Sequence, residues 1–229
     1  FEKWAEAGEK YAQALSIKPD KHDALLNWGT ALGDEARALL SEDRGKAFEK
    51  WAEAGEKYAQ ALSIKPDKHD ALFNWGSELG DEAQALLSED RGKAFEKWAE
   101  AGEKYAQALS IKPDMHEALN SLAGMLVQEY QALKLTDPDL ANTKLEEAGL
   151  HLESGISKSP KMYAYNYACY FAIRNNIEDC VYWLEEAQRY GNLPSQKHIN
   201  QDQDFDQARS SVEFQDWYKR TFNEDYITA

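Results

Sequence analysis

The sequence predicts an all-α fold built from repeated helix pairs, and three observations carry that prediction. A segment that begins FEKWAEAGEKYAQALSIKPD at Phe1 recurs at Phe48 and at Phe95, a period of 47 residues. Apolar residues within each period fall at helical spacing. No sustained alternation of apolar and polar residues between hairpin turns occurs, so no strands are expected. Repetition at a fixed period of this size is typical of repeat architectures.

Each period is expected to hold two amphipathic helices. The first helix carries apolar residues at Ala24, Leu25, Trp28, Leu32, Ala36 and Leu39, and the second at Trp51, Ala54, Tyr58, Ala61 and Leu62. Pro66 ends the second helix, because proline lacks an N–H and disfavours helical geometry in the residue before it. The same stop recurs at Pro19, Pro113 and Pro160. Between the two helices we expect a tight turn from Ser41 to Gly45, with Ser41 capping the helix that follows.

The period divides the chain into an array of units. Residues 1–19 are the second helix of an incomplete repeat, 20–66 repeat 1, 67–113 repeat 2, 114–160 repeat 3, 161–191 a shorter repeat 4, and 192–229 a C-terminal cap. The cap is expected to cover the last repeat with Phe205, Val212, Phe214, Trp217 and Tyr218. Because the chain begins at Phe1 and not at Met, we expect it to be a piece of a longer protein.

The spacing of large and small residues resembles the tetratricopeptide family. The pattern consists of Leu25-x-x-Trp28-Gly29-x-x-Leu32, then Ala54-x-x-x-Tyr58-x-x-Ala61, then Pro66, and it returns in register over roughly residues 1–190. The small residues stand where neighbouring helices must approach closely. The resemblance implies a right-handed α-α superhelix, a solenoid of antiparallel helix pairs closed by a C-terminal capping helix. Units of that family have about 34 residues, so the longer period here is expected to lengthen both helices.

In that family the first helix of each pair lines a concave groove that binds a peptide. The resemblance carries this role to Leu26, Asn27, Thr30, Phe73, Asn74, Ser77, Glu78, Asn120, Ser121, Tyr165 and Asn166. An asparagine at the position of Asn27, Asn74 and Asn166 often binds the backbone of the ligand in the family. The lysines with which some members clamp a C-terminal carboxylate are missing, because Leu26 and Phe73 stand in their place. Acidic neighbours favour a protein or peptide that carries apolar residues and Lys or Arg.

The first two copies differ at only four positions: Leu26 and Phe73, Thr30 and Ser77, Ala31 and Glu78, Arg37 and Gln84. All four lie on the first helix, and 26, 30 and 37 share a face away from the core stripe. Two interpretations stay open. Either this face contacts a partner and has been tuned, or exposed positions have simply drifted.

The sequence offers no set of residues for catalysis. No phosphate-binding glycine loop, serine nucleophile elbow or paired-histidine motif is present, so we expect neither an enzyme nor a cofactor nor a metal. Asp202-x-Asp204-x-Asp206 resembles the start of a calcium loop, but Gln207 stands where that loop needs glycine. Helix capping and a solvated turn are the preferred interpretations of these aspartates.

The formal charge of −15 and the pI near 4.8 argue against nucleic acid and anionic membranes as partners. Two cysteines do not make a disulfide framework, which favours the cytoplasm. Repeat 4 and the tail are similar to the C-terminal end of several bacterial tetratricopeptide proteins, which suggests a bacterial source. A scaffold that binds a protein segment is the leading hypothesis. The alternatives are a structural module that self-assembles through an open N-terminal edge, and the regulatory or docking part of a larger enzyme.

Overall fold

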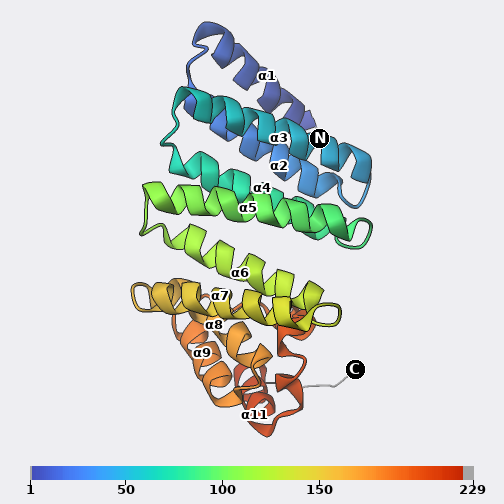
Figure 1. Cartoon of the computed structure of the whole chain (residues 1–229), viewed down its shortest axis with the longest axis vertical. Coiled ribbons are helices and arrows are strands. Elements are labelled where there is room, and N and C mark those ends of the chain that lie inside the picture. Colours follow the sequence, from blue (N-terminus) through green and yellow to red (C-terminus); the bar gives the residue numbers. More distant parts are fainter. Residues whose placement is uncertain (1, 224–229) are drawn as a thin grey trace. The chain divides into compact units, whose positions relative to one another are not determined.

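The computed structural model describes residues 2–223. Within that range every regular element is a helix, and consecutive helices pack in pairs, so the predicted all-α helical repeat is confirmed (Figure 1). The helices form two compact units, which divide between Ala118 and Leu119 inside α6 (His116–Leu133). Each unit has its own hydrophobic core.

Unit 1 consists of long helices packed in chain order. It contains α1 (Glu2–Ile17), α2 (His22–Leu39), α3 (Arg44–Ile64), α4 (His69–Leu86) and α5 (Arg91–Ile111). Each helix packs on the next, and α2 also contacts α4. Helices α2 and α3 have 18 and 21 residues, whereas α8 and α9 in unit 2 have 14 and 13. The long period therefore lengthens both helices of a pair, as the sequence predicts.

The helix ends of unit 1 follow the expected turn chemistry with one correction. The residue that caps α3 is Asp43, whose carboxylate accepts a hydrogen bond from the Lys46 amide at 3.1 Å, and not Ser41. Asp43 lies three residues before Lys46, the spacing at which a capping side chain reaches a free amide of the first turn. Asp90 caps α5 in the same way. Helix α3 ends at Ile64, two residues before Pro66.

The helices of each pair approach closely where a tyrosine ring lies on a glycine. A Cβ atom added to Gly29 of α2 would lie 2.8 Å from the ring of Tyr58 of α3, and one added to Gly76 of α4 would lie 2.9 Å from the ring of Tyr105 of α5. Tyr58 is fully buried, and Ala54 and Ala61 beside it are also inaccessible to solvent. The expected role of these small residues is therefore confirmed.

Unit 2 holds the rest of α6 and the elements that follow it. These are α7 (Pro138–Ile156), α8 (Pro160–Ile173), α9 (Ile177–Arg189), α10 (Gln196–Gln201), two short 3₁₀ turns, η1 (Gln203–Phe205) and η2 (Ala208–Ser210), and α11 (Val212–Phe222). Helix α8 packs on α7, on α9 and on η1, and α11 packs on α9. Pro160 is the first residue of α8, a position where its missing N–H costs no helical hydrogen bond.

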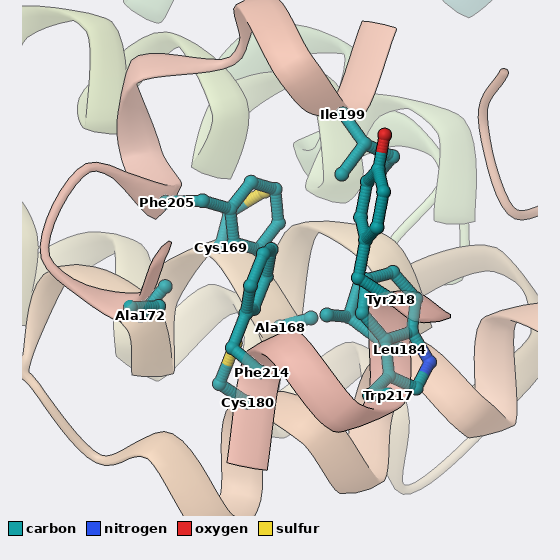
Figure 2. Close-up of a cluster of buried hydrophobic side chains, with 11 residues drawn as sticks. Ala168, Cys169, Ala172, Cys180, Leu184, Ile199, Phe205, Phe214, Trp217 and Tyr218 are labelled. Atoms are coloured by element: carbon teal, nitrogen blue, oxygen red, sulfur yellow. The ribbon is translucent and has the colours of Figure 1, made fainter. Parts of the chain in front are cut away.

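The core of unit 2 joins the last helix pair to the C-terminal segment. Cys169, Leu184, Phe205, Phe214 and Trp217 belong to one buried cluster, in which side chains of α8 and α9 meet those of η1 and α11 (Figure 2). The C-terminal segment thus covers the apolar faces of the last helix pair. Four of the five residues expected to do so contribute buried surface, whereas Val212 is 67% exposed.

The contact between Gly29 and Tyr58 gives a direct test of the packing. We expect Gly29→Ala to lower the free energy of unfolding by about 1–3 kcal/mol, because the new methyl group would overlap a buried ring. Gly80→Ala is the matched control, since its Cβ atom would meet nothing within 4 Å. The control should gain up to about 1 kcal/mol from helix propensity. Urea denaturation measures both, and equal losses in the two variants would contradict the role given to Gly29.

Candidate partner-binding face

Hydrogen bonds connect the first helices of successive repeats in unit 1. The Asn74 amide donates to the Thr30 hydroxyl at 3.1 Å, and the Thr30 hydroxyl lies 3.3 Å from the Tyr58 hydroxyl. One repeat later, the Tyr105 hydroxyl donates to Ser77 at 3.2 Å. Residues that the sequence predicts to bind a partner therefore form hydrogen bonds inside the array. Asn74 and Thr30 connect α4 to α2, and the tyrosine hydroxyls connect each first helix to its own second helix. We call Asn27, Thr30, Phe73, Asn74 and Ser77 the first-helix face of unit 1.

The residues expected to bind a partner in unit 1 differ in their accessibility. Asn27 is exposed, and among the described residues nothing hydrogen-bonds its side chain or the amide oxygen of Asn74. Phe73 is half-buried and its ring lies 6.0 Å from that of Tyr105. Leu26 is only 8% exposed and belongs to the core cluster of Tyr58. Little of Leu26 is therefore available to a partner.

Glu78 is buried, and its carboxylate is bound by two groups of repeat 1. Its Oε2 accepts a hydrogen bond from Arg37 at 2.8 Å and another from the Trp51 indole at 3.2 Å. The carboxylate occupies the space that a side chain at Gly33 would take, since a Cβ atom there would lie 2.1 Å from it. Only 5% of Glu78 is exposed. The carboxylate of Glu78 thus forms contacts between repeat 1 and repeat 2 and is not accessible to a partner.

Two of the four differences between the copies meet in this ion pair. Arg37 has Gln84 as its counterpart in the second copy, and Glu78 has Ala31 as its counterpart in the first. The pair therefore joins the one arginine and the one glutamate that distinguish the copies. Neither interpretation of these differences from sequence included a contact between repeats. The signal was present in the sequence as two charge changes of opposite sign on the first helices of the two copies.

The ionisation of Glu78 reflects its burial. Loss of solvent raises the pKa of Glu78 to about 7, and the charge of Asp81 acts in the same direction, although Arg37 and Trp51 oppose both. Arg37 also bonds Asp34 at 2.5 Å and Asp81 at 2.7 Å. One guanidinium group therefore serves three carboxylates, and the cluster keeps an excess of negative charge.

In unit 2 the predicted residues fall into two groups. The Asn166 amide of α8 donates to the Asn120 side chain of α6 at 3.0 Å, and Ser121 is half-buried. Tyr165 instead contacts the C-terminal segment, because its hydroxyl donates to Asp202 at 2.5 Å. The groove positions of repeat 4 are therefore partly covered by the chain itself.

One cluster in unit 2 gathers residue types that bind metals elsewhere. Cys169, Asp202 and Asp204 bring a sulfur and two carboxylate oxygens within 4.8 Å of one another. Each group is hydrogen-bonded inside the chain: the thiol donates to Asp202 at 3.8 Å, and Asp204 accepts from Gln131 at 2.6 Å. Asp202 also caps η1 by accepting from the Asp204 amide, which confirms the capping role expected from the sequence. We assign no metal site to this cluster.

Comparison of the chain with protein-family models and with curated proteins finds no match. None of the helices in residues 2–223 combines the length and the apolar character that crossing a membrane requires.

The ion pair between the repeats predicts how two substitutions combine. We expect Arg37→Gln, which places the second copy's residue in the first, to lower the free energy of unfolding by roughly 1–3 kcal/mol, because it leaves Glu78 buried without a cation. Adding Glu78→Ala should recover most of that loss, since both members of the pair are then gone. Denaturant titration of the two single variants and the double variant measures the coupling. Additive losses would contradict it.

The raised pKa of Glu78 predicts a specific dependence of stability on pH. The folded chain holds this proton at pH values where the unfolded chain has lost it, so the contribution is present below the usual pKa of 4.5 and is lost as pH rises through about 7. Between pH 5 and pH 8, the free energy of unfolding of the wild type should therefore fall by roughly 1–3 kcal/mol relative to that of Glu78→Gln. Parallel pH profiles of the two proteins would show that Glu78 does not titrate in this range.

Proposed function

We propose that the chain is a non-catalytic scaffold of the tetratricopeptide type that binds a protein or peptide segment on the first-helix face of unit 1. The observation that supports this most is the combination of accessible polar and apolar groups on two packed helices. Asn27 and the amide oxygen of Asn74 are available for the backbone of a ligand, and Phe73 offers apolar surface. A face that offers both amide groups for the main chain of a ligand and an apolar contact suits an extended segment or a helix.

The charge beside this face sets the chemistry of the proposed ligand. Asp34 and Asp81 have side chains that are 55% and 48% exposed, and they share Arg37 with the buried Glu78. Because one cation does not balance Asp34, Asp81 and the ionised fraction of Glu78, this cluster carries net negative charge. A segment with Lys or Arg beside apolar residues fits it, and nucleic acid does not.

The same proposal extends to the compartment and the source. Cys169 and Cys180 are buried free thiols, and burial raises the pKa of Cys180 to about 12, so neither thiol is reactive in the closed fold. Two free thiols suit a reducing compartment such as the cytoplasm. The similarity of repeat 4 and the tail to bacterial tetratricopeptide proteins supports a bacterial source.

A charge-matched pair of variants tests the proposed face. Asp34→Asn with Asp81→Asn removes two exposed charges from the first helices, whereas Glu56→Gln with Glu103→Gln removes two exposed charges at equivalent positions of α3 and α5. A fluorescein-labelled peptide of alternating lysine and leucine is titrated with each protein, and its anisotropy is recorded. We expect the first variant to weaken binding about tenfold and the second to leave it within about twofold, because the contact is local.

The same comparison is then made with Phe73→Ala, which removes apolar surface and no charge. This variant should also weaken binding of the peptide, because the leucines lose their contact. A peptide that binds the wild type, the Asp34/Asp81 variant and Phe73→Ala equally well would rule out this face. Thermal unfolding of each variant shows that it is folded.

A further inference from the structure

The segment Asp202–Phe205 lies over the face of α8 that the sequence assigned to a partner. Its Asp202 carboxylate accepts the Tyr165 hydroxyl at 2.5 Å, and the ring of Phe205 lies 6.0 Å from the ring of Tyr165. Phe205 has no exposed surface and belongs to the same buried cluster as Cys169, beside which Figure 2 shows it. Tyr165 and Cys169 are therefore covered by residues of their own chain.

This cover is held by side-chain hydrogen bonds to two helices. Asp202 binds α8 through Tyr165 and Cys169, and Asp204 binds α6 through Gln131. The segment is also braced from within. Arg209 donates to the carbonyl oxygen of Asp202 at 2.6 Å and to two further carbonyl oxygens, those of Ile199 and Asn200. Two aspartates thus carry the polar attachment of the segment to the helices.

The carboxylates of Asp202 and Asp204 lie close together, so they repel each other when both are ionised. Their carboxylate oxygens and the Cys169 sulfur lie within 4.8 Å of one another. Burial and the charge of Asp202 together raise the pKa of Asp204 to about 6, against the opposing effects of Gln131, Cys169 and Lys134.

The cations around the pair do not cancel its charge. His198 lies 3.8 Å from Asp202, and its side chain is 58% exposed to solvent, which screens any interaction between the two. Arg209 forms its ion pair with Asp206 and turns its other nitrogen to carbonyl oxygens. Tyr165 and Cys169, the titratable groups of α8 at this site, contact Asp202 as neutral donors. Protonation of Asp204 therefore relieves the repulsion between the two carboxylates.

We propose that Asp202–Phe205 is a proton-controlled cover of the α8 face, which closes firmly over Tyr165 and Cys169 while Asp204 is protonated and loosens when Asp204 is ionised. Closure retains a proton that an open segment would release. Closing is thus favoured below the ordinary aspartate pKa of 3.8, and the advantage is lost as pH rises through about 6. This behaviour does not depend on the proposed partner.

The thiols of the unit report the opening. Cys169 lies under the cover and contacts Asp202, whereas Cys180 of α9 is equally buried in the same cluster and has no hydrogen bond to either aspartate. Both are labelled with 4,4′-dithiodipyridine between pH 4 and pH 8, and mass spectrometry gives the two rates. Dividing each rate by that of the urea-denatured chain at the same pH removes the intrinsic reactivity of the thiol.

In the wild type, the protection of Cys169 relative to Cys180 should fall between pH 4 and pH 8, by at most about a hundredfold for a shift of two pKa units. Asp204→Asn keeps a hydrogen-bonding group but cannot titrate, so its protection ratio should not change with pH. Asp216→Asn removes an exposed aspartate of α11 and is the matched control, which should behave like the wild type.

Three results would overturn the proposal. The first is a ratio that stays constant with pH in the wild type, which means that the thiols are exposed together by unfolding of the whole unit. The second is a pH dependence that survives in Asp204→Asn. The third comes from amide hydrogen exchange of the wild type, which needs no variant to fold: residues 199–206 should exchange faster relative to α9 as pH rises, after correction for intrinsic rates, and an unchanged ratio contradicts the cover.

Discussion

The close approach of a tyrosine ring to a glycine is the contact on which the architecture of unit 1 depends. Because Gly29 has no side chain, the ring of Tyr58 can lie directly against the backbone of α2, and this contact sets the separation of the two helices. The hydroxyl of the same ring lies within hydrogen-bond distance of the Thr30 hydroxyl, which also accepts a hydrogen bond from the Asn74 amide of the next repeat. One residue thus links the packing within a pair to the hydrogen bonds between pairs.

The contact of Tyr58 with Gly29 is repeated in the second copy, whereas the buried Glu78 occurs in the second copy alone. Copies that differ at four positions present nearly the same surfaces, so packing alone barely distinguishes one neighbour from another. The pair of Arg37 with Glu78 forms only when the first copy precedes the second. An ion pair with one buried member adds little net stability, since desolvation of Glu78 offsets much of the attraction, but it can specify the register. We interpret it as the element that marks the order of the two copies.

The sequence predicted the helices and their close contacts because those depend on local spacing. Gly29 and Ala54 permit close approach of a neighbouring helix, and Pro66 ends a helix, whatever the arrangement of the repeats. The ion pair could not be predicted in this way, because it joins residues 41 positions apart and the pattern does not say which faces of two repeats meet. The capping residue of α3 could not be predicted either. Ser41 and Asp43 are both good capping residues, and the exact start of the helix decides between them.

The residues predicted to line the groove have different hydrogen-bond partners in the two units. In unit 1, Thr30 and Ser77 bond to tyrosines of the second helices, so the hydroxyls are consumed inside the array while Asn27 and Phe73 remain accessible. In unit 2, Tyr165 bonds to the C-terminal segment, and the apolar residues of that segment complete the core. A terminal repeat has no following pair to cover it, and the chain meets this need with its own residues. The hydroxyl of Tyr165 is therefore already bonded to Asp202 of the same chain, and the end of the array uses a side chain that the sequence assigned to the binding face.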